Sequence, residues 1–184
     1  MGGAARAEVD PGGNLAYNDL HLGLMRYCPP SKLQAIIASH ADPDIIASLN
    51  KWMVSTHCKV MISRLWTRFV PHFTTGKDYS ARIVGIPDEG MNIALGDSRI
   101  KALPAHFMHS EGNFQFYDPV SKILFSGDMG ASLVDHEQAA KPVTDFDDHV
   151  ITMAGFHRRY MISNKICRFW VNMVRQLDVE MIVP

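Results

Sequence analysis

The chain has 184 residues, of which 47% are hydrophobic and 20% charged, and its formal net charge is −1. This length suits one domain over residues 1–184, and the near-neutral charge excludes the basic face typical of nucleic-acid-binding proteins. No apolar run reaches the ~20 residues of a membrane span, and the N-terminus lacks the apolar segment of a secretory signal. Cys28, Cys58 and Cys167 lie far apart in the sequence, which predicts reduced thiols and a cytoplasmic protein.

Helices and strands are predicted to alternate in the first part of the chain, up to residue 73. Apolar residues at helical spacing predict helices, and short apolar runs predict buried strands. The predicted elements are a strand end and turn at 7–13, a helix at 15–27, a strand at 33–39, a helix at 45–55, a strand at 59–63 and a helix at 64–73 interrupted at Pro71.

Short strands dominate the middle of the chain, and helical spacing returns from about residue 145. The predicted strands are 82–87, 91–96, 99–108, 113–119 and 122–128, with a hairpin turn at 118–121. An apolar stripe from Ile162 to Leu177 predicts a helix, and 179–184 predicts a last strand. A block of strands flanked by helices indicates two sheets between helical layers. The abrupt strands at both ends suggest a truncated chain.

Three groups of polar side chains each follow a predicted apolar strand. They are the S-H-A-D-P-D stretch with His40, Asp42 and Asp44, the H-F-M-H-S-E-G-N stretch with His106, His109 and Glu111, and the S-G-D stretch with Asp128. A carboxylate at such a strand end is costly unless it is solvated, hydrogen-bonded or bound to a metal. The three groups therefore predict a metal site at one edge of the sheets.

Each group also has an ordinary structural interpretation when it is taken alone. Asp44 precedes a predicted helix and is a good N-cap candidate. His106 alternates with Met108 and is typical of a half-buried strand residue, and Asp128 suits a turn between two glycines. The order of the groups along the chain favours the metal site over three unrelated turns.

That order resembles the metallo-β-lactamase fold, which implies an α/β (α+β in some schemes), four-layer αββα sandwich. Hydrolases of that fold carry H-x-H-x-D-H in the first group, whereas this chain has Asp42 and Ile45 in place of two histidines. The stretches 109–132 and 156–170 are similar to oxygen-binding di-iron proteins, relatives of the flavodiiron proteins. The resemblance covers nearly the whole chain.

The resemblance implies two iron ions, with manganese or zinc as substitutes, held by a defined set of ligands. These ligands are His40, Asp42, Asp44, His109 and Asp128, with Asp128 as the bridge. Carboxylates with few imidazoles suit iron or manganese. The family mostly has Glu where Asp42 stands, and its last His ligand follows the final strand, where this chain ends. Tyr160 and His106 are candidates for the surroundings of the metal site.

Four functions stay open from the sequence. The resemblance implies O2 binding or reduction, in a sensor or oxygen-scavenging role, without catalytic residues separate from the metal ligands. An NO or O2 reductase would need an outside electron donor such as a flavoprotein or rubredoxin. Relatives carry chemotaxis or signalling domains, and a homodimer is a further candidate state. A zinc hydrolase and an inactive interaction domain are the alternatives from other classes.

Overall fold

Two β-sheets pack face to face in the computed structural model, which describes residues 5–161 and 163–184. The first sheet is parallel, in the order β1-β2-β3-β4, and the second has the order β5-β6-β7-β8-β9, antiparallel except for the β8–β9 pair. The strands are β1 (Ala7–Val9), β2 (Ala35–Ile37), β3 (Lys59–Ser63), β4 (Ile83–Ile86), β5 (Met91–Leu95), β6 (Ser98–Pro104), β7 (Phe114–Asp118), β8 (Ile123–Phe125) and β9 (Met181–Val183).

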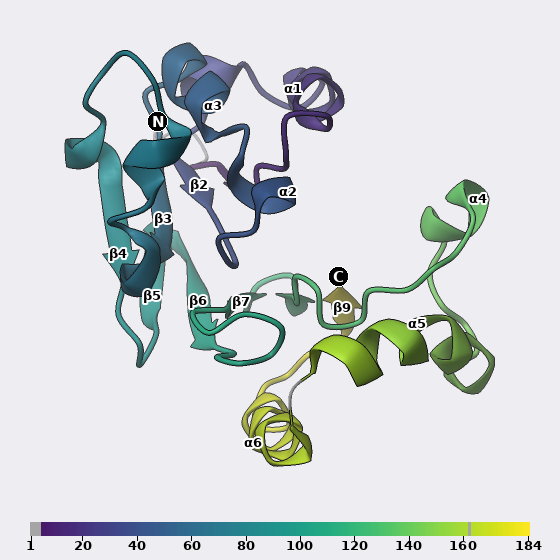
Figure 1. The fold of residues 1–184 in the computed structure, drawn as a ribbon. Helices are drawn as coiled ribbons and strands as arrows, with labels where there is room; N and C mark the ends of the chain where they lie inside the picture. The colour runs from purple at the N-terminus through teal and green to yellow at the C-terminus, as the bar shows by residue number, and fades with distance from the viewer. Residues whose placement is uncertain (1–4, 162) are drawn as a thin grey trace.

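Helices cover the outer faces of both sheets (Figure 1). The α-helices are α1 (Tyr17–Met25), α2 (Pro43–Ile46), α3 (Leu49–Ser55), α4 (His136–Ala139), α5 (Phe146–Tyr160) and α6 (Asn164–Val174). The 3-10 helices are η1 (Pro30–Lys32), η2 (Arg64–Trp66), η3 (Val70–Phe73) and η4 (Ser80–Arg82). The first sheet carries α1, α2 and α3, and the second sheet carries α6, so the predicted αββα order is confirmed. No helix in the described part of the chain is long and apolar enough to span a membrane.

Alternation along the strands divides the core into three layers. In β2, Ile36 packs with the first helical layer, and Ile37 packs between the two sheets. In β7, Phe116 packs between the sheets, while Tyr117 packs toward α6. Successive side chains of a strand point to opposite faces, so each sheet contributes to two layers. This explains why β2 reads as an uninterrupted apolar run.

The helical predictions at 45–55 and 64–73 are wrong in detail. The first region splits into α2 and α3 at Ala47 and Ser48, where the Ser48 amide donates to the Gly12 carbonyl at 3.3 Å instead of continuing the hydrogen bonds of α2. The second region forms η2 and η3 rather than an α-helix, and Pro71 lies in the first turn of η3. Long-range contacts override the local helical spacing at both places.

Most other predicted elements are confirmed. The hairpin turn between β7 and β8 is held by Asp118, whose carboxylate accepts from the Val120 amide at 2.9 Å and the Ser121 hydroxyl at 2.7 Å. The stripe predicted from Ile162 to Leu177 lies on α6 and the turn that follows it, and Ile162 itself lies outside the described residues. Apolar residues of the stripe, such as Ile166, pack in the layer outside the second sheet.

The turn between β4 and β5 generates a stability prediction. Gly90 has φ +82°, and an added Cβ would collide with the Ala102 carbonyl oxygen. We expect Gly90→Ala to lower the free energy of unfolding by roughly 1–3 kcal/mol, because both the backbone and the neighbouring strand oppose it. Gly23→Ala in α1 is the matched control, since no atom lies within 4 Å of its Cβ, and it should gain about 0.5–1 kcal/mol. Urea unfolding of both variants checks this, and equal midpoints would contradict it.

Candidate metal centre

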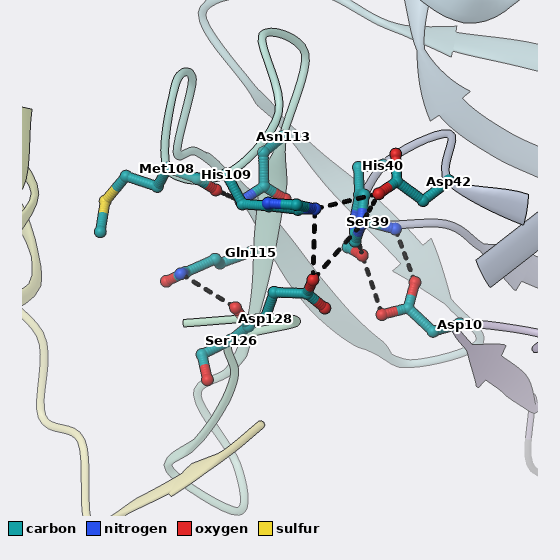
Figure 2. A network of polar contacts seen from close by, with 10 residues as sticks. All are labelled: Asp10, Ser39, His40, Asp42, Met108, His109, Asn113, Gln115, Ser126 and Asp128. Carbon is teal, nitrogen blue, oxygen red and sulfur yellow. Dashed lines mark hydrogen bonds and ion pairs between the residues drawn. The ribbon is translucent and has the colours of Figure 1, made fainter. Parts of the chain in front are cut away.

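His40 lies in the turn between β2 and α2, with its side chain almost fully enclosed. It is 1% exposed, and its Nδ1 atom lies 2.8 Å from the Ser39 hydroxyl. Its Nε2 atom faces the Oδ2 atoms of Asp42 at 3.7 Å and Asp128 at 3.9 Å (Figure 2). Nε2 is buried and has no hydrogen-bond partner among the described residues. A buried polar atom of this kind is unfavourable unless a ligand completes its interactions.

Asp42 is free to face the two histidines because it does not cap α2. It occupies the N-cap position of α2, yet its carboxylate makes no capping hydrogen bond. Its Oδ2 instead lies 2.9 Å from Nε2 of His109. The alternative interpretation of Asp44 as the N-cap is therefore wrong: Asp44 lies two residues after Asp42, in the first turn of α2, and is exposed.

His109 is presented by a loop between β6 and β7 whose backbone is strained. Phe107 and His109 have φ of 63° and 75°, in the left-handed region that residues other than glycine rarely adopt. Asn113 holds the loop by donating from Nδ2 to the Met108 carbonyl at 2.7 Å. Nε2 of His109 consequently points at Asp42 and lies 3.4 Å from Oδ2 of Asp128.

Asp128 reaches the centre because the loop after β8 passes close to the His40 turn. Gly127 has φ +54°, and a Cβ there would lie 3.2 Å from the Ser39 hydroxyl oxygen. A side chain at this position would crowd the Ser39 hydroxyl and strain the left-handed backbone of residue 127. The turn that the sequence indicates around Asp128 exists, and it brings the carboxylate beside both imidazoles.

The donor atoms lie close enough together to converge on one metal ion, although two of their separations, 3.7 and 3.9 Å, exceed the spacing around a bound ion. Ligand atoms about 2.1 Å from an ion lie about 3.0–3.4 Å from one another in octahedral or tetrahedral geometry. His40, His109 and Asp128 offer atoms that all lie within 4.8 Å of one another. Asp42 adds a further oxygen, 2.9 Å from His109. The unpartnered Nε2 of His40 and this spacing show that the residues present fit a metal ion.

The other predicted site residues are placed differently. Asp44 is exposed, and it does not join the compact group of ligands found in the described chain. Tyr160, on the last turn of α5, lies edge-on to His109 with 4.9 Å between ring centroids. His106 lies elsewhere: its Nε2 is 2.9 Å from the Asp88 carbonyl, and its ring packs on Phe114.

A pocket of about 380 Å³ opens beside the candidate ligands. Asp42, His109 and Glu111 of the second polar group are among its lining residues. The rest of the lining is mainly aromatic, from Trp66, Phe69, His72 and Phe73. The amino-acid pattern gives no sign that these residues lie at the site, because the helical spacing at 64–73 indicates a helix that packs on the core.

Asp10 is a further residue of the centre that the sequence did not reveal. Its carboxylate accepts from the backbone amide of Ser39 at 2.7 Å and from the Ser39 hydroxyl at 2.9 Å (Figure 2). Burial raises the pKa of Asp10 above its ordinary value, while the two hydrogen bonds from Ser39 and the nearby His40 act in the opposite direction. The stretch 7–13 indicated a strand end and turn, which is correct, but not this contact.

Residues 2–184 match a protein-family model that is described as ODP family beta lactamase. A curated relative, an uncharacterized protein of Methanocaldococcus jannaschii, is 23% identical over 183 residues. The match covers 96% of this chain and 44% of the relative, so the chain spans less than half of the relative's length.

Solved structures of similar fold agree with the family match. The apo state of the chemotaxis sensor ODP from T. denticola is 42% identical with a TM-score of 0.89, and a peroxy di-iron form of the sensor ODP has 0.87. Each match covers 97% of this chain and 72% of the sensor chain. A flavoprotein from Thermotoga maritima has a TM-score of 0.82 at 16% identity, over 98% of this chain and 44% of that one, which shows the shared fold alone.

The carboxyl group of Glu8, on the strand that leads to Asp10, generates a pH prediction. Burial, and then the charge of Asp10, raise the pKa of Glu8 to about 7. The folded chain therefore keeps a proton that the unfolded chain loses, and the free energy of unfolding falls as pH rises from about 4.5 to about 7. Glu8→Gln should remove this loss.

We expect the metal-free Glu8→Gln variant to be more stable than the parent at pH 8, by on the order of 1–2 kcal/mol once partial solvent exposure is discounted. At pH 4 the two proteins should match. Urea unfolding with a chelator present, at both pH values, measures the difference. A variant that is less stable than the parent at pH 8 would show that the Glu8 carboxylate is stabilising.

Proposed function

The chain belongs to the ODP family of β-lactamase-like proteins, and from that premise we propose that it is a non-haem di-iron protein that binds O2 in a sensing role. The observation that carries the proposal is the buried, unpartnered Nε2 of His40, which faces Asp128 beside His109. The sensor ODP, 42% identical, is described as a di-iron protein. Reduction of O2 in a scavenging role is the enzymatic form of the same proposal.

The donor set supports iron over zinc. Hard carboxylate oxygens with a minority of imidazoles suit iron or manganese, whereas hydrolytic zinc sites are richer in histidine. Position 42 is Asp and position 45 is Ile, so the histidines of the hydrolase pattern are missing from the first polar group. These two positions count against a zinc hydrolase, although manganese or zinc could replace iron in the same ligands.

The ligands divide into two groups in our proposal. His40, His109 and Asp128 would hold the first iron, since one ligand atom of each lies within 4.8 Å of the others, and Asp42, 2.9 Å from His109, would join them. Asp44 would serve the second iron together with Asp128 as a shared carboxylate. The exposed position of Asp44 supports weaker binding of that second ion by this chain.

An iron pair, when bound, supplies the electrons and the open coordination position that O2 requires. The protein's own residues orient the site and limit water around it. Phe156 and Tyr160 pack on the ring of His109, with centroids at 5.8 and 4.9 Å. Trp66 and Phe69 line the pocket on the Asp42 side. A small apolar gas is compatible with this aromatic surface.

A reductase acting on NO or O2 is the second candidate, because the same carboxylate-rich donor set suits a redox-active iron pair. Such turnover needs an outside flavoprotein or rubredoxin as electron donor.

For the sensing protein, the proposal also includes a signalling domain, a homodimer and a cytoplasmic location. The free thiols of Cys28, Cys58 and Cys167 support a reducing compartment. Sustained O2 or NO consumption with reduced rubredoxin would favour the reductase over the sensor.

Metal content tests the proposal directly. Protein produced with iron and purified without oxygen should contain iron in excess of zinc and manganese, measured by elemental analysis. Asp128→Ala should lose most of this iron, because its carboxylate faces both histidines. His106→Ala should retain it, since His106 contacts Asp88 and not the candidate ligands. Iron that is unchanged in Asp128→Ala would count against the site.

Reaction with O2 is the second test. Stopped-flow mixing of the reduced, iron-loaded protein with O2 should change the visible absorbance, because the electronic transitions of iron respond to its ligands and oxidation state. Asp44→Ala should weaken the change if two ions are required, while leaving the first iron in place. A flat trace, together with thioester or lactam hydrolysis by the zinc-loaded protein, would restore the hydrolase function.

A further inference from the structure

The contacts of Ser39 fix the direction of a short hydrogen-bond chain from Asp10 to His40 (Figure 2). The Ser39 hydroxyl has one proton, and it donates that proton to Oδ2 of Asp10 at 2.9 Å. The same oxygen lies 2.8 Å from Nδ1 of His40. Because the hydroxyl proton is already committed to Asp10, the oxygen can only accept from the ring. Nδ1 of His40 therefore carries the proton.

The opposite nitrogen of the ring then has a free lone pair. Nε2 of His40 is the buried atom without a partner, and it faces Asp128 and Asp42. A neutral imidazole can bind a metal only through its unprotonated nitrogen. The hydrogen bond on the far side of the ring selects which nitrogen this is.

We propose that Asp10 and Ser39 are positioning residues, which hold His40 in the Nδ1-protonated tautomer and so keep Nε2 available to a metal ion. This inference rests on the proposed metal-binding function, although the tautomer itself exists without a metal. Neither residue touches the candidate ion. Their contribution lies in the proton arrangement and orientation of the ring.

The backbone around both residues supports the assignment. Asp10 has φ 56°, an unusual conformation for a residue other than glycine, and its amide donates to the Ile37 carbonyl at 2.9 Å. The carboxylate is thereby directed at Ser39 from a fixed turn. The Ser39 amide also donates to Oδ1 of Asp10 at 2.7 Å, so both carboxylate oxygens are engaged. The orientation of the carboxylate is thus set by two donors from one residue.

The second of these bonds makes Asp10→Asn an unusually sharp test. The Ser39 amide can only donate, so the carbonyl oxygen of the new Asn side chain must face it. The NH2 group then faces the Ser39 hydroxyl and donates to it. The hydroxyl proton must turn to Nδ1 of His40, which shifts the ring to the Nε2-protonated tautomer. The substitution should reverse the chain of hydrogen bonds at nearly constant volume.

Two measurements at pH 8 test the inference. The first is the tautomer of His40 in metal-free protein labelled with 15N, read from the nitrogen shifts of the imidazole and assigned with His40→Ala. The second is the affinity for Fe(II) measured anaerobically by competition with a chelator. The variants are Asp10→Asn, Ser39→Ala and the control Glu8→Gln. The control removes the carboxyl group of Glu8, which lies on β1 shortly before Asp10 and makes no contact with Ser39.

The parent should show protonated Nδ1, and Asp10→Asn should show protonated Nε2 with iron affinity lowered about 10- to 100-fold. Ser39→Ala should mix the tautomers and lower the affinity less. Glu8→Gln should keep both properties of the parent. An unchanged tautomer in Asp10→Asn and Ser39→Ala would overturn the inference, as would an equal loss of affinity in Glu8→Gln. If the parent protein bound no iron, the proposed function would be refuted. The roles of Asp10 and Ser39 would still be tested, because the tautomer of His40 is measured without metal.

Discussion

Ser39 is the point at which the two sheets are joined at the candidate centre. Its carbonyl accepts from the Phe114 amide, at the start of β7, at 2.9 Å. Its amide and hydroxyl are engaged by Asp10, and its side chain touches the position of Gly127. One small buried residue thus connects the end of β2 with the loops that carry the other candidate ligands. A larger side chain there would separate His40 from Asp128.

The segment between β8 and α6 is built differently from the rest of the fold. None of the residues of α5 is buried, and the helix extends away from the sheets in Figure 1. Its stability depends on local features: Asp145 caps the first turn, and the last turn carries His157, Arg158 and Arg159, which complement the helix dipole. Only its C-terminal end, through Phe156 and Tyr160, reaches the candidate centre.

Much of this architecture can be predicted from the sequence, since apolar runs and polar strand ends are local signals. The strands, the turn at Asp118 and the convergence of His40, His109 and Asp128 follow from them. The hydrogen bonds of Asp10 could not be predicted, because they join residues 29 positions apart and depend on an unusual φ. The contacts of His106 could not be predicted for a related reason: only two residues separate it from His109, but the backbone at Phe107 is left-handed and the two rings have different partners.

The left-handed backbone at His109 has a consequence for the energetics of ligand capture. Conformations of this kind cost about 1–3 kcal/mol, and the cost falls on the folding of the loop. Asn113 and the contact with Asp42 maintain the conformation in the chain without a ligand. Little conformational entropy then remains to be lost when an ion arrives, so more of the interaction energy appears as affinity. The loop is in this sense preorganised: the stability of the fold is lowered slightly so that less reorganisation accompanies binding.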